Sequence, residues 1–244
     1  MAGFAFTLDE IRKTKNPEGE SDDVIFRISI DPNYKDDFLE MRVPRFCSSE
    51  GVVSWLRWLK KLETIREVKS WANKPDVTHA AIKLLLKGNA REIYVENFTD
   101  QADNLTANGS TNGAITNQKI DSALFEITKS FFFGLQPRSS IKHFLGTVVK
   151  PPDMTITEFY LAFKEVLSFI PYVSHSAESS TSTSIDYTSE ELYFLFSKTL
   201  PENWKSDFES TGRPLTMKAL VQYCQIIEGV ESNKQIIRRK LSLV

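Results

Sequence analysis

The side chains that most often do chemistry are few in this chain and lie far apart. The three histidines, His79, His143 and His175, fall in three different segments, and none has an acidic or nucleophilic neighbour at a spacing typical of a site. A lone histidine is weak evidence for a site, because its ring also serves in packing and at surfaces. Cys47 and Cys224 are too far apart for a ligand pair and too few for a disulfide framework, so we expect small buried thiols in a reducing compartment. The sequence therefore predicts no catalytic, cofactor-binding or metal-binding residues.

The sequence also lacks the motifs of the common enzyme classes. The sequence has no Gly-rich phosphate loop, no HExxH or GxSxG motif, no zinc-spaced Cys/His cluster and no Asp-Thr/Ser-Gly protease signature. Paired carboxylates such as Glu190-Glu191 stand at turns or helix starts, where solvent or the helix dipole stabilises them without a catalytic role. We expect that the chain is not an enzyme.

Composition and charge restrict the class of protein further. The chain has 244 residues, of which 41% are hydrophobic and 25% charged, with a net charge of −2 and a pI near 6.0. This is the composition of a folded soluble protein. It does not fit a domain whose whole surface neutralises phosphates, for which a pI above about 9 is usual. No uncharged apolar run approaches the ~18 to 20 residues that cross a bilayer, so we expect a cytoplasmic protein without membrane contact.

The periodicity of apolar residues predicts a mainly α protein with a short N-terminal β-ribbon. Alternating apolar residues within 24–46 predict two strands, whereas later segments repeat apolar residues every three or four positions, as amphipathic helices do. We expect two small helix-bundle lobes, residues 1–136 and 137–244. Three polar or basic segments are predicted to be exposed: a flexible insertion at 99–118, a flexible Ser/Thr loop at 174–186 and a basic tail at 233–244.

The order of these segments from Phe38 to Glu228 resembles the Gag capsid region of long-terminal-repeat retrotransposons of the Ty3/gypsy lineage. The first half is similar in a short extended piece ending in Pro and Phe and in a Trp-bearing first helix, MRVPRFCSSEGVVSWLRWLKKL. The second half is similar in a Phe-rich helix, an acid-started helix that runs into Leu200-Pro201 with Trp204 beyond, and a closing helix. These segments are TITEFYLAFKEVLSFIP, YTSEELYFLFSKTLPENWKSDF and LTMKALVQYCQIIE.

The sequence departs from the retroviral pattern in two places. Retroviral capsids carry a Gln, Glu and Arg network in the segment that enters the Phe-rich helix, and here the corresponding residues 150–162 have Ala162 where the Arg would stand. We expect this network to be missing or replaced, which favours a transposon over a retrovirus. The zinc knuckle that follows capsid in many Gag proteins is also absent.

The resemblance implies a structural protein that self-assembles into a virus-like particle around element RNA. The N-terminal lobe would form pentamers or hexamers, and the C-terminal lobe would join these rings through two-fold contacts. RNA would be bound weakly, or through a separate nucleocapsid segment, inside cytoplasmic particles. Two alternatives stay open, namely a viral-type nucleocapsid or other RNA-binding protein, and a domesticated Gag that acts as a host interaction module.

Aromatic and basic clusters supply the candidate contact residues. Trp55 and Trp58 lie on adjacent faces of one helix, so one of them is a candidate for contact with a neighbouring molecule. The consecutive apolar residues around Tyr193 cover all sides of another helix, as expected of deep burial or of an interface. The interface candidates are Trp55, Trp58, Glu191, Tyr193, Phe194 and Trp204. The candidates for RNA contact are Lys234, Arg238, Arg239 and Lys240, for which the alternative is a solvated helix end.

Overall fold

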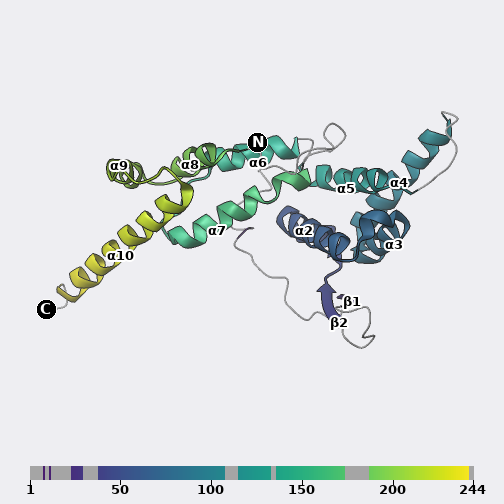
Figure 1. Cartoon of the computed structure of the whole chain (residues 1–244), viewed down its shortest axis with the longest axis horizontal. Coiled ribbons are helices and arrows are strands. Elements are labelled where there is room, and N and C mark those ends of the chain that lie inside the picture. The colour runs from purple at the N-terminus through teal and green to yellow at the C-terminus, as the bar shows by residue number, and fades with distance from the viewer. Residues whose placement is uncertain are drawn as a thin grey trace. The chain divides into compact units, whose positions relative to one another are not determined.

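The structure, a computed structural model, confirms a mainly helical fold with a short N-terminal antiparallel β-ribbon (Figure 1). It describes residues 23–29, 38–107, 115–132, 136–173 and 187–241, together with Leu8 and Ile11. The chain divides into two compact units. Unit 1 comprises Met1–Pro137 and Tyr172–Ser180, and unit 2 comprises Arg138–Pro171 and Thr181–Val244.

A two-stranded ribbon opens unit 1. Strand β1 (Val24–Ser29) pairs antiparallel with β2 (Phe38–Val43), so that Val24 stands opposite Val43. Pro44 follows β2 and has no N–H for the ladder, which ends there. The Pro44 carbonyl oxygen instead accepts a hydrogen bond from Trp58 Nε1 at 3.1 Å. This bond ties the end of the ribbon to the first long helix.

A second, very short sheet separates two helices of unit 1. Strand β3 (Phe46–Cys47) pairs in parallel with β4 (Leu86–Lys87). Gly88 follows β4 with a φ of 51°, a left-handed conformation that glycine adopts without steric cost. The chain therefore breaks between α3 (Pro75–Leu85) and α4 (Gly88–Ala107).

The core of unit 1 contains the two tryptophans of α2 (Val52–Val68). The Trp55 ring is fully buried, and its Nε1 donates a hydrogen bond to Thr128 Oγ1 of α5 (Asn117–Phe131) at 2.9 Å. Trp58 stacks on Trp55 with ring centroids 5.1 Å apart, and Phe46 covers both rings. Unit 1 also contains two short 3-10 helices, η1 (Ser48–Glu50) and η2 (Trp71–Asn73).

The predicted flexible insertion at 99–118 is wrong at both ends. Helix α4 continues to Ala107, and α5 begins at Asn117, where Thr116 Oγ1 accepts the backbone N–H of Lys119 at 3.3 Å. Residues 99–107 contain neither Gly nor Pro, the two residue types that strongly disfavour a helix. The polar composition of this stretch predicts a loop, but polar residues do not by themselves end a helix. Residues 108–114 of the insertion, like the predicted loop 174–186, lie outside the described residues.

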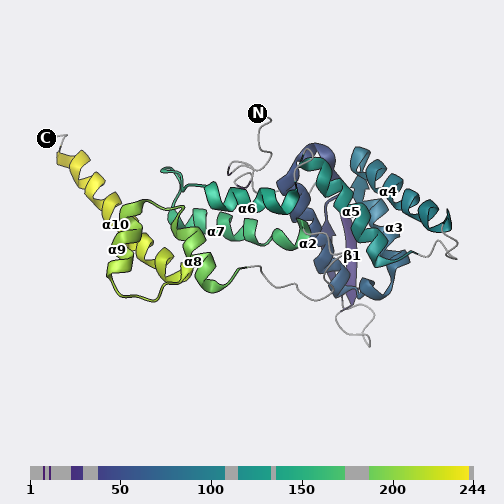
Figure 2. The same cartoon turned by 90° about the horizontal axis from the view of Figure 1, so that it is seen from above.

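Unit 2 is a helical bundle with an aromatic core. Its described helices are α6 (Pro137–Thr147, of which Pro137 belongs to unit 1), α7 (Ile156–Leu167), η3 (Ile170–Val173, which ends in unit 1), α8 (Ser189–Ser197), α9 (Glu202–Ser210) and α10 (Met217–Leu241). Phe159 and Phe163 of α7 pack against Phe196 of α8, with ring centroids 5.8 and 5.1 Å apart. Phe208 of α9 packs against Tyr223 of α10. Figure 2 shows α8 and α9 lying beside α10.

Helix α10 contains the backbone of most of the predicted basic tail. Its first half packs on α7, α8 and α9 and buries Leu220, Val221 and Cys224. The helix then continues to Leu241, although the side chains beyond Val230 are not among those described. Within the part of the chain that the structure covers, no helix combines the length and the apolar character needed to cross a bilayer.

Candidate functional site

Helix α8 is the element that the sequence singled out for self-association, and a capping box fixes its start. The Glu191 backbone N–H donates to Thr188 Oγ1 at 3.1 Å, and Glu191 Oε2 accepts the Thr188 backbone N–H at 2.7 Å. The hydrogen bonds from Thr188, its backbone N–H first, hold the pKa of the Glu191 carboxyl below its usual range. Glu191 is exposed, as an interface residue should be, but its carboxylate already serves the cap.

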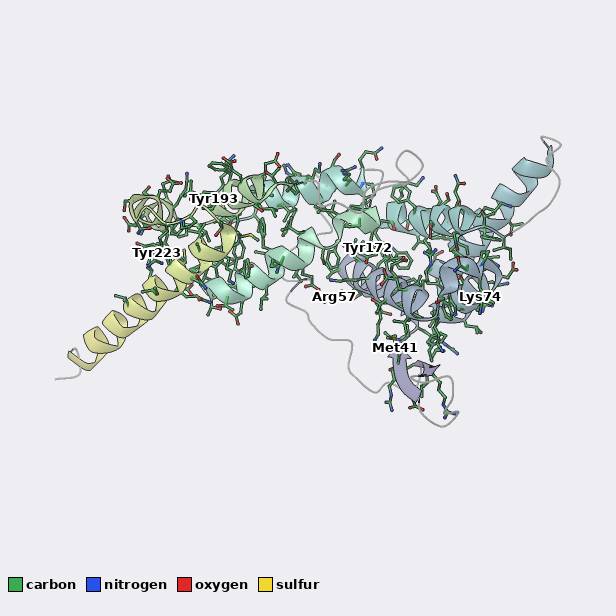
Figure 3. The ribbon with its side chains drawn as sticks, viewed as in Figure 1. Met41, Arg57, Lys74, Tyr172, Tyr193 and Tyr223 are labelled. Atoms are coloured by element: carbon green, nitrogen blue, oxygen red, sulfur yellow. The ribbon has the colours of Figure 1, made fainter. Side chains whose placement is uncertain are left out.

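The consecutive aromatic residues of α8 have different environments. The Tyr193 ring is fully buried, and its hydroxyl donates to Glu209 Oε1 of α9 at 3.1 Å. Burial, and then this hydrogen bond, raise the pKa of Tyr193 to about 12. Phe194, by contrast, is 42% exposed, while the edge of its ring meets Tyr193 at 5.4 Å between centroids. Figure 3 labels Tyr193 on α8 and Tyr223 on α10.

The outer face of α8 is therefore a mixed surface with one large apolar side chain. Glu190, Glu191 and Phe194 are exposed on this helix, and so is Lys198 at its C-cap. An exposed aromatic ring that packs against a buried neighbour, as Phe194 does against Tyr193, can act as an anchor in a protein contact. Little conformational entropy is lost when such a ring is covered. Of the aromatic residues predicted at the interface, Phe194 is the one with this exposure.

Trp204, another predicted interface residue, is a core residue of unit 2. It is only 6% exposed, and the Lys150 ammonium lies 5.4 Å from its ring centroid, a cation–π contact. Lys150 Nζ also lies 3.1 Å from Glu228 Oε1. These three residues line a surface groove of about 910 Å³, together with Pro152, Asp153, Met154, Thr155, Thr157, Pro201, Asn203, Gln225 and Gly229.

A polar network joins this groove to the start of α7. Both oxygens of Glu228 accept the Ile156 backbone N–H, at 2.9 and 3.0 Å, and Gln225 Nε2 donates to Thr157 Oγ1 at 2.8 Å. Residues at the start of α7 and just before it thus belong to a polar network whose carboxylate comes from α10. No sequence pattern indicates Glu228, because it lies 72 residues from Ile156. Only the packing of the helices brings the two residues together.

The expectation that Trp55 or Trp58 faces a neighbouring molecule is corrected by their burial. Trp55 is 0% exposed and Trp58 is 4% exposed. Two indoles on adjacent faces of one helix are expected to be difficult to bury in one small core. They fit because their rings are nearly parallel, at 15°, and because Phe46 and α5 enclose the pair. Together with Tyr193 and Trp204, they stabilise the units rather than forming an outer surface.

The four basic residues predicted to contact RNA are Lys234, Arg238, Arg239 and Lys240. Their backbone is helical, within α10, and their side chains lie outside the described residues. Their role therefore stays a prediction.

The histidines and cysteines stand in ordinary packing environments where they are described. His79 Nδ1 lies 3.0 Å from the Tyr94 hydroxyl, and burial lowers the pKa of His79. His143 is exposed on α6, and His175 lies outside the described residues. Burial raises the pKa of the Cys224 thiol to about 12. Among the described residues, no three His, Cys, Asp or Glu side chains gather in a group that could hold a metal ion.

Comparison with protein-family models, with curated proteins and with solved structures gives no match for this chain.

Proposed function

We propose that this chain is a structural capsid protein of the Gag type from a long-terminal-repeat retrotransposon, which assembles with copies of itself into a shell around element RNA. The support lies in the resemblance of residues 38–228 to such proteins and in the helical units with separate aromatic cores. Symmetric repetition lets one chain build a closed shell. Each contact can be weak, because the first contact raises the effective concentration for the next.

The observation that carries this proposal is the exposed ring of Phe194 on α8. Its neighbours Tyr193 and Phe196 are fully buried, so α8 is anchored and Phe194 is presented outward in a fixed position. In capsid proteins of this type the corresponding helix forms the two-fold contact between rings. The proposal assigns this contact to the outer face of α8, with Phe194 at its centre.

The experiment is to measure the assembly of the purified chain by light scattering and electron microscopy over a range of concentrations and salt. We expect large particles or rings from the unmodified chain. Phe194→Asp should shift the material towards small species, since it places a charge where an aromatic ring would be covered. Circular dichroism should remain that of the folded chain.

Leu161→Asp provides a matched control. Leu161 is 60% exposed on α7, also in unit 2, so the substitution makes the same change of charge at a comparable surface position. Equal loss of assembly in both variants would mean that added charge, and not the α8 contact, is responsible. An unmodified chain that stays monomeric under all conditions would contradict the proposed function itself.

A further inference from the structure

Helix α3 in unit 1 carries an apolar stripe on the side that faces away from its core. Its inner face is buried through Thr78, Ala81, Ile82 and Leu85. On the outer face, Val77 is 46% exposed and Leu84 is 61% exposed, with the exposed Ala80 between them. The spacing of three and four residues places these side chains in one line along the helix. Figure 1 shows α3 at one side of the cluster of helices in unit 1.

Two opposite charges lie along the same edge of this stripe. Asp76 is exposed in the first turn of α3, and Lys83 lies seven residues further on, hence two turns along the helix on nearly the same side. Within one chain the two residues are separated by about 10 Å of helix rise, too far for an ion pair. Neither forms an ion pair or hydrogen bond with any side chain that the structure describes.

We propose that this outer face of α3, the α3 stripe, binds the same face of a second copy of this chain in an antiparallel, two-fold contact. A two-fold axis at Ala80 would place Val77 against Leu84 of the other copy, and Leu84 against its Val77. The small side chain of Ala80 lets the two helices approach closely at the axis.

Charge complementarity selects the second copy as the partner. In an antiparallel helix pair, residues on the same edge face each other. Asp76 of each copy therefore meets Lys83 of the other. The contact then contains two ion pairs, which are related by the two-fold axis. A parallel two-fold pairing would put the charged edges of the two copies on opposite sides of the contact, so that Asp76 of one copy would not meet Lys83 of the other.

This contact deepens the proposed function, since it adds a site of self-association in unit 1 to the one proposed on α8. Two 11-residue helices bury less surface than the roughly 1,200 Å² of a stable interface. The α3 contact is accordingly weak by itself and gains strength when other contacts hold the copies together.

Cysteine crosslinking of the whole chain tests the contact. In Ala80→Cys the two new thiols meet at the axis, within the Cβ separation of about 3.5 to 4.5 Å that a disulfide requires. Mild oxidation should convert this variant to a covalent dimer, whereas the unmodified chain controls for Cys47 and Cys224. Glu92→Cys, at an exposed position on α4, controls for random collision. A dimer yield for Ala80→Cys no higher than for Glu92→Cys would overturn the proposal.

Charge exchange in the Ala80→Cys background tests the pairing. Asp76→Lys alone and Lys83→Asp alone should each slow crosslinking about threefold or more, and the two together should restore it. The double variant shares any effect of the single changes on helix stability, so restoration reports the facing pair. Failure to restore would overturn the antiparallel arrangement. Particles without crosslinking would refute this contact alone, and crosslinking without particles would refute the proposed shell alone.

Discussion

The carboxylate of Glu228 accepts the backbone N–H of Ile156 through both of its oxygens, at 2.9 and 3.0 Å. Ile156 is the first residue of α7, so its backbone N–H has no partner within the helix. Glu228 therefore caps α7 from the middle of α10, and it places a negative charge at the positive end of the helix dipole. The same carboxylate pairs with the buried ammonium of Lys150.

Replacing Glu228 should destabilise unit 2 strongly. Glu228→Gln keeps the size of the side chain but leaves the Lys150 charge, with its side chain only 7% exposed, without a counterion. Breaking a buried pair on one side typically costs about 3 to 5 kcal/mol. Because the Glu228 side chain is itself 23% exposed, we expect the lower end of that range, about 3 kcal/mol, in urea unfolding followed by circular dichroism.

The pair of Glu202 and Lys205 on α9, separated by 3.6 Å, offers the control, because the Glu202 side chain is 79% exposed. Glu202→Gln should change the free energy of unfolding by less than about 1 kcal/mol, because solvent screens surface pairs. Similar losses in the two variants would show that the Glu228 network has no special role.

Much of the fold was predictable because local patterns decide it. The alternation of apolar residues predicted the β-ribbon, and the repeats of three and four residues predicted the helices. The outward direction of Val77 and Leu84 and the cap of α7 by Glu228 were not predictable, since they depend on which helices pack together. The same limit applied to the aromatic contact residues. Apolar residues around a helix predict that some side must be covered, but the sequence could not show that Tyr193 is buried while Phe194 is exposed.

The hydrogen bond between Trp55 and Thr128 should stabilise unit 1 measurably. Thr128→Val keeps the shape of the side chain but leaves the buried Trp55 N–H without its acceptor at 2.9 Å. An unsatisfied buried donor costs about 1 to 3 kcal/mol, so urea unfolding followed by tryptophan fluorescence should show a loss of about 2 kcal/mol. Thr64→Val removes only an exposed hydroxyl on α2 and should change stability by less than about 0.5 kcal/mol. A loss at position 128 no larger than at 64 would contradict this role for the bond.

High pH should destabilise unit 2 through Tyr193. The folded state raises the pKa of this hydroxyl to about 12 from 10.0, chiefly by burial. A raised pKa for an acid means that the neutral form is favoured by folding. The stability that Tyr193 contributes is therefore complete below pH 10 and is lost as the pH rises towards 12. In a spectrophotometric titration of phenolate, Tyr193→Phe should remove one tyrosine that ionises well above pH 10. In urea unfolding at a series of pH values, the same substitution should reduce the loss of stability between pH 10 and about 12. If the tyrosine lost from the titration curve of Tyr193→Phe is one that ionises near pH 10, burial does not raise the pKa of Tyr193.

Binding of RNA by the C-terminal part of α10 should depend on salt in proportion to the charges involved. Each cation that neutralises a phosphate of single-stranded RNA contributes about 0.7 to the slope of log affinity against log salt concentration. Replacing Lys234, Arg238, Arg239 and Lys240 by Gln should therefore lower this slope by about 3 in filter binding with polyuridine. A variant with Lys60, Lys61, Lys74 and Lys87 changed to Gln has the same net charge and places the loss in unit 1. If both variants reduce the slope equally, overall charge explains the binding. If only the α10 variant does so, this part of α10 is the segment that meets RNA inside the proposed shell.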